Sequence, residues 1–313
     1  MQIVENINEL SEKIKGGTCV TVGTFDGVHR GHGEILKYLK FVSEKNNLHS
    51  IVFTFGSHPR NIVSSGKEDV KILTDINEKA ELISEYGIDF LFVQNFTTDF
   101  SSLSAEQFVE DFLVEKLKLK NLVIGHDHFF GKGRVGNFDL LNNLSNKFSF
   151  NLFQIAAVCN SGFDISSTKI RKSLLSGDIA FANEMLGYKY FLSGSVSKGY
   201  NLGNKLGFPT ANIELSCKEK LIPVSGVYIV NVFYKSKVFQ GLLNIGTRPT
   251  FNGQKMQVEV HLFDFNENIY GEQLKIELLL FLRSEKKFSS SEELVMQIRK
   301  DRDSAFKYFG RTC

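Results

Sequence analysis

Two histidines, separated by an arginine and a glycine, lie in a glycine-rich segment near the start of the chain. The segment reads Val22-Gly23-Thr24-Phe25-Asp26-Gly27-Val28-His29-Arg30-Gly31-His32. It follows an apolar, strand-like run and precedes residues with helical spacing. Glycines let the backbone approach a ligand closely, and the first N–H groups of a helix attract an anion. Two histidines placed there can donate hydrogen bonds to a phosphate, whose oxygens gain negative charge during nucleotidyl transfer.

The simpler interpretation of this segment is a tight strand-to-helix turn with two surface histidines. We favour phosphate binding because the His-x-Gly-His pattern falls at a strand–helix junction, where an anion site is expected. On this interpretation His29 and His32 act on the reacting phosphate. The neighbouring residues predicted to bind ATP are Gly23, Phe25, Asp26 and Gly31.

A second candidate segment opens a predicted helix and reads Ile165-Ser166-Ser167-Thr168-Lys169-Ile170-Arg171. Hydroxyl side chains at a helix start usually cap its free N–H groups, and that interpretation stays open. The hydroxyls of Ser167 and Thr168, with the guanidinium of Arg171 one turn on, also suit a phosphate clamp. A third segment, Gly125–Arg134, superficially resembles a Walker A loop, but its spacing is wrong and Gly133 replaces the magnesium-binding hydroxyl. It either holds a nucleotide or flavin or is a basic surface loop.

The second half of the chain has its own candidate site in a glycine-punctuated loop. Gly199, Gly203 and Lys205 precede Pro209, and these four are the predicted ATP-binding residues. The hydroxyl of Thr210 and the amide oxygen of Asn212 follow, and magnesium prefers such hard oxygen ligands. The alternative is an ordinary loop of a β-domain with a proline turn.

Glu259 stands in a predicted strand whose sides differ. Glu259 and His261 share one face, and Val258 and Val260 share the other. This pattern usually means only an amphipathic strand. A glutamate beside a magnesium–ATP loop can instead accept the proton of a substrate hydroxyl during phosphoryl transfer.

Alternating strand-like and helical patterns in the first half predict a mainly parallel sheet covered on both faces, with ligands at the carboxyl ends of its strands. The strands are expected at Cys19–Phe25, Ser50–Phe55, Asp89–Val93, Asn121–Ile124 and Leu152–Val158. Helices are expected over the residues that follow each strand, including Asn77–Tyr86, Ser104–Lys118, Phe138–Leu144 and Lys169–Leu175. The opening of the second of these, at Ser104, resembles a capping box.

From Gly187 onward the pattern changes to short β-rich runs, which predict an antiparallel barrel or sandwich. The runs are Tyr190–Val196, Gly226–Tyr234, Val238–Ile245, Gln257–Phe263 and Leu274–Leu282, and an amphipathic helix over Ser289–Tyr308 follows. We therefore predict two domains, 1–186 and 187–313.

The composition limits the classes of function. The 313 residues carry 37 basic and 35 acidic side chains, and the net charge of +2 gives no long-range attraction to nucleic acid or a membrane surface. We therefore expect neither partner, and the oligomeric state stays open. No two of the four cysteines form a CxxC pair, which favours a reducing compartment. Neither a signal peptide nor a membrane-spanning run is evident, so we expect a cytoplasmic protein.

The first-half motifs carry a family resemblance. The two histidines and the Ser-Ser-Thr-x-Ile-Arg element look like the nucleotidyltransferase superfamily. With Thr54–Pro59 and the Gly-x-Asp loop, the match resembles bacterial bifunctional riboflavin kinase/FMN adenylyltransferases. The resemblance implies a Rossmann-like domain in which both histidines contact the ATP phosphates and Ser167, Thr168 and Arg171 clamp them. It implies a flavin or nucleotide pocket with His58 and Asp127.

The second half resembles the riboflavin kinase family over nearly all of residues 187–313. The motifs are Pro209–Asn212, Ile245–Phe251, Val258–Phe265, Ile269–Gly271 and Leu282–Phe288. The resemblance implies a six-stranded barrel with a C-terminal helix, and Thr210 and Asn212 near Mg²⁺. It implies Glu259 as the base for the ribityl 5′-hydroxyl, and Arg283 in the flavin or nucleotide pocket.

Together the two resemblances imply an enzyme that makes FAD from riboflavin by way of FMN, with ATP as co-substrate and Mg²⁺ as cofactor. Two alternatives stay open. In one, only the kinase is active and the first half is a degenerate nucleotide-binding domain, although its intact His29, His32, Thr168 and Arg171 argue against this. In the other, the chain is a non-enzymatic flavin-binding or RNA-binding regulator, and turnover would distinguish it from the enzyme.

Overall fold

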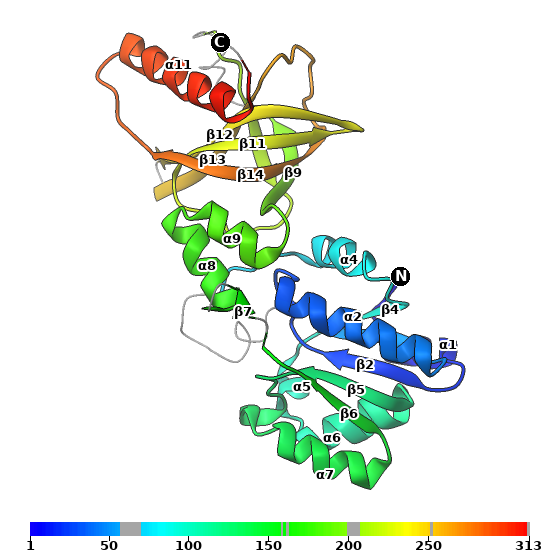
Figure 1. The fold of residues 1–313 in the computed structure, drawn as a ribbon. Helices are drawn as coiled ribbons and strands as arrows, with labels where there is room; N and C mark the ends of the chain where they lie inside the picture. The colour runs from blue at the N-terminus through cyan, green and yellow to red at the C-terminus, as the bar shows by residue number, and fades with distance from the viewer. Residues whose placement is uncertain (57–69, 158, 161–162, 199–206, 251–252, 312–313) are drawn as a thin grey trace. The chain divides into compact units, whose positions relative to one another are not determined.

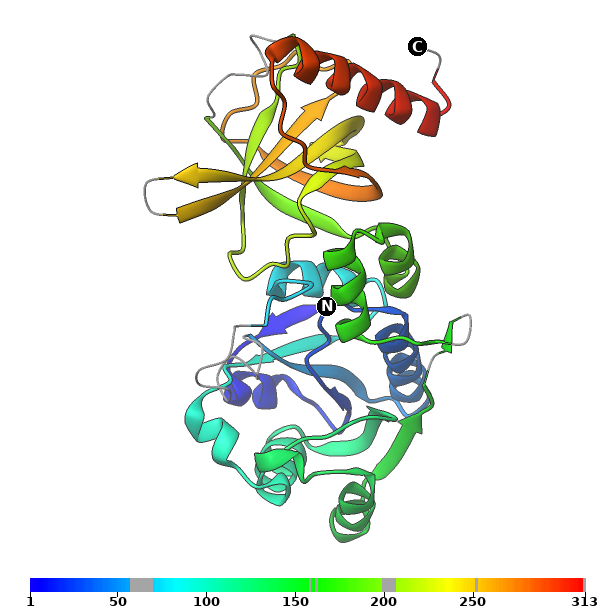
Figure 2. The same cartoon turned by 90° about the vertical axis from the view of Figure 1, so that its left-hand side faces the viewer.

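A computed structural model of the chain describes residues 1–56, 70–157, 159–160, 163–198, 207–250 and 253–311. The chain divides into two compact units, Met1–Ser167 and Thr168–Cys313. In Figures 1 and 2 the first unit contains a sheet with helices packed on it, and the second contains a barrel and helices.

The first unit is built on a six-stranded parallel sheet in the order β1-β4-β3-β2-β5-β6. All of β2 is buried, as are the five central residues of β3, and such continuous apolar runs are typical of parallel strands covered on both faces. The predicted parallel sheet is thus confirmed. Its strands are β1 (Gln2–Val4), β2 (Thr18–Val22), β3 (His49–Phe55), β4 (Phe90–Gln94), β5 (Leu119–Gly125) and β6 (Asn151–Ile155).

Helices cover both faces of this sheet. Val20 and Val22 lie in the apolar cluster with η1, so Cys19 and Thr21 point to the other face, where α2 packs on β2, β3 and β5. The helices are α1 (Ile7–Lys13), α2 (Arg30–Lys45), α4 (Ile76–Ser84), α5 (Thr98–Ser102), α6 (Ala105–Gln107), the π-helix η1 (Phe108–Lys116), the 3₁₀ turn η2 (Lys132–Arg134) and α7 (Phe138–Phe148). A short hairpin, β7 (Cys159–Asn160) and β8 (Phe163–Asp164), completes the described part of the unit.

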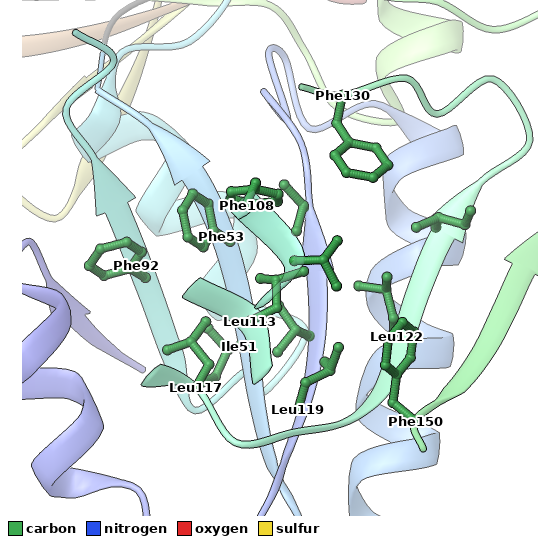
Figure 3. Close-up of a cluster of buried hydrophobic side chains, with 14 of the residues drawn as sticks. Ile51, Phe53, Phe92, Phe108, Leu113, Leu117, Leu119, Leu122, Phe130 and Phe150 are labelled. Atoms are coloured by element: carbon green, nitrogen blue, oxygen red, sulfur yellow. The ribbon is translucent and has the colours of Figure 1, made fainter. Parts of the chain in front are cut away.

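Aromatic side chains fill the core between the sheet and η1 (Figure 3). Phe53 meets Phe92 edge-on, with ring centroids 4.9 Å apart, and Phe108 of η1 at 5.4 Å. Full burial of one such side chain stabilises the fold by about 1.5–3 kcal/mol. This core fixes β3 and β4 against η1 and so holds the carboxyl ends of the strands in place.

The strand order defines where a ligand is expected. From β2 the chain adds β3 and β4 on one side of the sheet, and later adds β5 on the other side of β2. In open α/β sheets ligands usually bind at such a reversal, which here lies at the carboxyl ends of β2 and β5. The segments that start at Gly23 and Gly125 both begin there.

The second unit contains a closed antiparallel barrel in the order β10-β13-β12-β11-β14-β9. Of the two architectures predicted from the β-rich runs, the barrel is therefore confirmed, with six strands and a terminal helix. The strands are β9 (Phe191–Ser197), β10 (Ala211–Leu215), β11 (Gly226–Tyr234), β12 (Lys237–Thr250), β13 (Gly253–Leu262) and β14 (Gln273–Ser284). The helices are α8 (Ser167–Ser176), α9 (Ile179–Leu186) and α11 (Ser291–Tyr308).

Two helices before the barrel pack with it. Asn183 of α9 donates its side-chain N–H to the carbonyl of Leu278 in β14 at 2.9 Å, and the carbonyl of Leu174 in α8 accepts from the N–H of Val224 at 3.2 Å. The division by contacts therefore falls at Ser167, before the domain boundary expected after Leu186. That boundary stays a prediction.

Candidate active sites

The turn from β2 to α2 has an unusual backbone. Phe25, Gly27 and Val28 all have positive φ, of 45°, 82° and 36°. For a β-branched valine this conformation is strained, and such strain persists only where surrounding contacts enforce it, often at ligand sites.

Asp26 supplies part of that enforcement. It is 3% exposed, and its Oδ1 accepts from the backbone N–H groups of Leu73 at 2.8 Å and Thr74 at 3.1 Å. Gly27 N–H donates to the Thr74 hydroxyl at 3.0 Å. Asp26 thus ties the turn to the residues that precede α4, and its predicted contact with ATP stays a prediction.

The two histidines stack on one another at the start of α2. Their ring centroids are 3.7 Å apart with planes 12° from parallel. His29 is the N-cap, and its Nδ1 accepts from the backbone N–H of His32 at 3.3 Å, which leaves Nε2 as its donor. A side chain at Gly31 would lie 3.2 Å from the His29 ring, so the glycine makes room for the stack.

His32 is held as a neutral imidazole. Burial, then the charge of His29, then that of Lys79 lower its pKa well below the usual value. Phe25 packs against it with ring centroids 5.0 Å apart. Within the described residues its buried Nδ1 has no hydrogen-bond partner. A buried polar atom without a partner calls for an explanation, and a ligand at this helix start is one, although phosphate contact by His32 stays a prediction.

The clamp predicted at the start of α8 is connected to the same turn through one residue. Ser167 donates its hydroxyl to the Asp26 carbonyl at 2.9 Å. Thr168 and Arg171 follow in the first turn of α8, and phosphate clamping by all three stays a prediction.

The loop after β5 leaves Asp127 accessible. Its side chain is 79% exposed, and its Oδ1 lies 3.9 Å from His126 Nδ1. A side chain at Gly125 would lie 3.2 Å from Ile35 of α2, so the glycine lets the helix pack closely on this strand end. His58, the other residue expected in this pocket, lies outside the described residues.

In the barrel, strand register brings the predicted kinase residues together. Glu259 of β13 pairs with Asn212 of β10 on one side and with Asn244 of β12 on the other. Paired residues project from the same face, so two carboxamides flank one carboxylate. The hydroxyl of Thr210 donates to Glu259 Oε2 at 3.4 Å.

The face of β13 that carries Glu259 is the one predicted. Val258 and Val260 are buried, at 4% and 0% exposure, and Glu259 is only half-buried. Val227 pairs with Asn244 and therefore projects from the same face as Glu259. Its side chain packs in a cluster with Ala305 of α11. The polar row therefore lies on the outer face of the barrel, toward the terminal helix.

Sequence-based reasoning assigned no role to two residues of this site. Asn244 is a polar residue in an apolar run, and such an exception can indicate a functional residue. Only the strand register shows that it lies opposite Glu259. His261 Nδ1 lies 2.7 Å from the Pro209 carbonyl and holds the start of the Pro-Thr-Ala-Asn segment against β13. The pKa of His261 is lower than usual, mainly because of burial. The bond to Pro209 raises it in part, and the charge of Arg302 lowers it further.

Arg283 forms an internal ion pair. Its Nε and Nη2 donate to the carboxylate of Asp301 in α11 at 2.7–3.0 Å, and its Nη1 donates to the Ser284 carbonyl at 3.0 Å. Asp301 is 4% exposed and also accepts from Gln297. Arg283 thus fastens α11 to β14, and its place in a ligand pocket stays a prediction. Gly199, Gly203 and Lys205 lie outside the described residues.

The donor chemistry of the barrel site suits a hard cation. Thr210 and Asn212 offer hydroxyl and amide oxygens, which are hard ligands of the kind that Mg²⁺ prefers. Over the ranges that the structure describes, no three or more His, Cys, Asp or Glu side chains gather where they could hold a metal ion. No helix there is both long and apolar enough to cross a membrane.

The fold and sites define a chain of two catalytic modules: a nucleotidyltransferase-like α/β unit and a barrel suited to phosphoryl transfer. The family model described as FAD synthetase matches residues 11–169, and that described as riboflavin kinase matches residues 186–309. The chain belongs to the family of bifunctional riboflavin kinase/FMN adenylyltransferases.

Named relatives match along the whole length. The bifunctional riboflavin kinase/FMN adenylyltransferase of Escherichia coli K12 is 37% identical over 313 residues, which is 100% of this chain and 99% of that protein. The protein of the same name from Haemophilus influenzae is 38% identical over 99% of this chain and 99% of that protein. A crystal structure described as a macrolide-efflux protein from Streptococcus pneumoniae is 28% identical, with a TM-score of 0.86 over 97% of this chain and 99% of that one.

Proposed function

We propose that this chain makes FAD from riboflavin in two ATP-dependent steps. The second unit phosphorylates riboflavin to FMN, and the first transfers the adenylyl group of ATP to FMN and releases pyrophosphate. The observation that carries the proposal is that one chain contains both the stacked histidines at the carboxyl end of β2 and the carboxylate of Glu259 beside Thr210 and Asn212.

In the kinase step Glu259 acts as the general base. It accepts the proton of the ribityl 5′-hydroxyl as that oxygen bonds to the γ-phosphorus and the bond to ADP breaks. Thr210 and Asn212 would hold Mg²⁺, which neutralises phosphate charge when bound. Asn244 is the neighbour of Glu259 on the next strand.

In the adenylyl step a phosphate oxygen of FMN bonds to the α-phosphorus of ATP, and the bond to pyrophosphate breaks. His29 and His32 donate hydrogen bonds to the oxygens that gain charge, and the helix start adds its N–H groups. Ser167, Thr168 and Arg171 clamp the phosphates, and Asp127 contacts the flavin or nucleotide. We expect the enzyme to work without nucleic acid, since its net charge is only +2. We expect it in the cytoplasm, since no CxxC pair is present among its four cysteines.

The test follows both products in time. The purified chain is incubated with riboflavin, ATP and Mg²⁺, and the flavins are separated by chromatography. FMN is expected first and FAD later. FMN alone would demote the first unit to a binding module, and bound flavin without turnover would favour the regulator.

Single substitutions then assign the two steps. Glu259→Ala is expected to abolish FMN formation and to leave FAD formation from supplied FMN, with Glu214→Ala on the exposed side of β10 as its control. His32→Ala is expected to let FMN accumulate without FAD, with His49→Ala at the opposite end of the sheet as its control. Loss of both activities in a folded single variant would contradict the division of labour.

A further inference from the structure

The strained turn between β2 and α2 is bonded to a residue outside its own motif, Thr74, which lies shortly before α4. Thr74 is 3% exposed, and its hydroxyl accepts a hydrogen bond from the backbone N–H of Gly27 at 3.0 Å. The backbone N–H of Thr74 donates to Oδ1 of Asp26 at 3.1 Å. Thr74 therefore binds two consecutive residues of the turn, one through its side chain and one through its backbone.

The peptide group that joins Asp26 to Gly27 is held at both ends. Its carbonyl oxygen accepts from the hydroxyl of Ser167 at 2.9 Å, and its N–H donates to the hydroxyl of Thr74. The orientation of a peptide group sets the backbone angles on either side of it. Two hydroxyls from distant parts of the chain thus fix the path of the turn at this point.

This peptide group lies immediately before the least favourable backbone of the turn. Gly27 has a φ of 82°, and Val28 has a φ of 36°. A valine keeps such an angle only where the surrounding contacts impose it. The next residue is His29, the N-cap of α2 on which the ring of His32 stacks. The contacts of Gly27 therefore determine where the histidine pair begins.

We propose that Thr74 is a positioning residue for adenylyl transfer, whose hydroxyl fixes the peptide group before Gly27 and thereby the place of the two stacked histidines. The inference rests on the proposed function of the first unit. Because α2 starts directly after the turn, a rotation of this peptide group displaces both rings. A displacement of about 1 Å near a reacting group can lower a rate about 100-fold.

The test removes the hydroxyl and keeps the shape of the side chain. Thr74→Val replaces the hydroxyl by a methyl group, and Thr74→Ser retains the hydroxyl. Thr18→Val is the matched control, since Thr18 is fully buried at the opposite end of β2 and its hydroxyl donates to the Leu117 carbonyl at 2.6 Å. The control therefore loses one buried, hydrogen-bonded hydroxyl away from the carboxyl ends of the strands.

Kinetics of FAD formation from supplied FMN are combined with hydrogen exchange. In Thr74→Val we expect kcat to fall about 100-fold with little change in KM, because the histidines act on charge that develops in the transition state. Peptides that contain Gly27 are expected to exchange faster, while those from β3 and β4 keep their protection. Thr74→Ser and Thr18→Val are expected to keep the wild-type kcat.

A double-mutant cycle separates positioning from a general loss of structure. Because Thr74 acts through the histidines, Thr74→Val is expected to cost little further rate in a chain that already carries His32→Ala. The residual rates of these chains are followed with ³²P in the α-phosphate of ATP. Equal fold losses in the two backgrounds would mean that Thr74 acts by another route.

The proposal is overturned by a wild-type kcat in Thr74→Val, by an equal loss in Thr18→Val, or by an additive cycle. Should Thr74→Val fail to fold, Thr74→Ala removes the same hydroxyl and takes its place in every comparison. A wild type that forms FMN but no FAD would refute the proposed function of the first unit. The exchange of the Gly27 peptides would then still decide whether Thr74 holds the turn.

Discussion

Lys79 in α4 is buried, with its Nζ bonded to the Thr54 hydroxyl and the Phe55 carbonyl, and its replacement by methionine is expected to make the first unit more stable. The pKa of this lysine falls from an ordinary value of 10.5 to about 8, mainly because of burial. That difference corresponds to about 3 kcal/mol by which the folded surroundings, burial offset in part by Asp26 and Asp75, disfavour the charged form at neutral pH. Methionine fills a similar volume with no charge to desolvate, so we expect the unfolding free energy to rise by up to that amount.

The sign of the pH dependence is fixed by the same pKa. The folded state releases the Lys79 proton near pH 8, whereas the unfolded chain keeps it until about pH 10.5. Between these values the unfolded state binds more protons, so this lysine makes the wild type more stable as pH rises. The advantage of Lys79→Met is therefore full below pH 8 and fades between pH 8 and 10.5.

The assay must report on each unit separately, and the chain contains no tryptophan. Pulsed hydrogen exchange in urea, read by mass spectrometry, follows peptides from β2 and β3 for the first unit and from β11 and β12 for the second. Lys37→Met controls for the loss of an exposed lysine. The reasoning is refuted if Lys79→Met is less stable at pH 7, or if its advantage stays constant up to pH 10.5.

Three further predictions concern the second unit. Arg283→Met is expected to lower its unfolding free energy by about 3–5 kcal/mol, because it leaves the buried Asp301 carboxylate without its cation; adding Asp301→Asn is expected to recover part of the loss in the same urea assay. Asn244→Leu is expected to lower kcat for riboflavin phosphorylation by less than the roughly 100-fold that a general base contributes, because it replaces the polar neighbour of Glu259 by an aliphatic one, and to leave adenylyl transfer unchanged. Chelation by EDTA is expected to stop FMN formation, and added Mg²⁺ restores it where Ca²⁺ does not, since Ca²⁺ takes more ligands at longer distances.

Most of the sheet could be predicted because its strands are continuous apolar runs. β2 and β3 are recognisable from their β-branched and aromatic residues, and the structure buries every residue of the first and the five central residues of the second. β1 has three residues with only one buried, and β10 has no clear alternation, so neither was predicted. The capping box at Ser104 was predicted and is confirmed, but the π-helix that follows has no sequence signal of its own.

Site residues could be predicted where the signal is local in the sequence, and could not where it depends on contacts between distant segments. His29 and His32 could be found because their spacing and their position after a strand are local features. The burial of Lys79 could not, because it depends on a hydrogen bond from α4 to Thr54 of β3 that no spacing reveals. Arg283 was expected near a ligand, whereas its bonds to Asp301 join two elements far apart along the chain.

The barrel core and the kinase site depend on one strand register. Leu243 and Ile245 flank Asn244 on β12, and both are fully buried. Val258 and Val260 flank Glu259 on β13, and their exposed fractions are 4% and 0%. A slip of one residue between β12 and β13 would turn this apolar set outward and place an aliphatic side chain beside the carboxylate. The hydrophobic interior therefore enforces the alignment of Asn212, Glu259 and Asn244, so a core substitution that loosens the register is expected to reduce kinase activity before it unfolds the barrel.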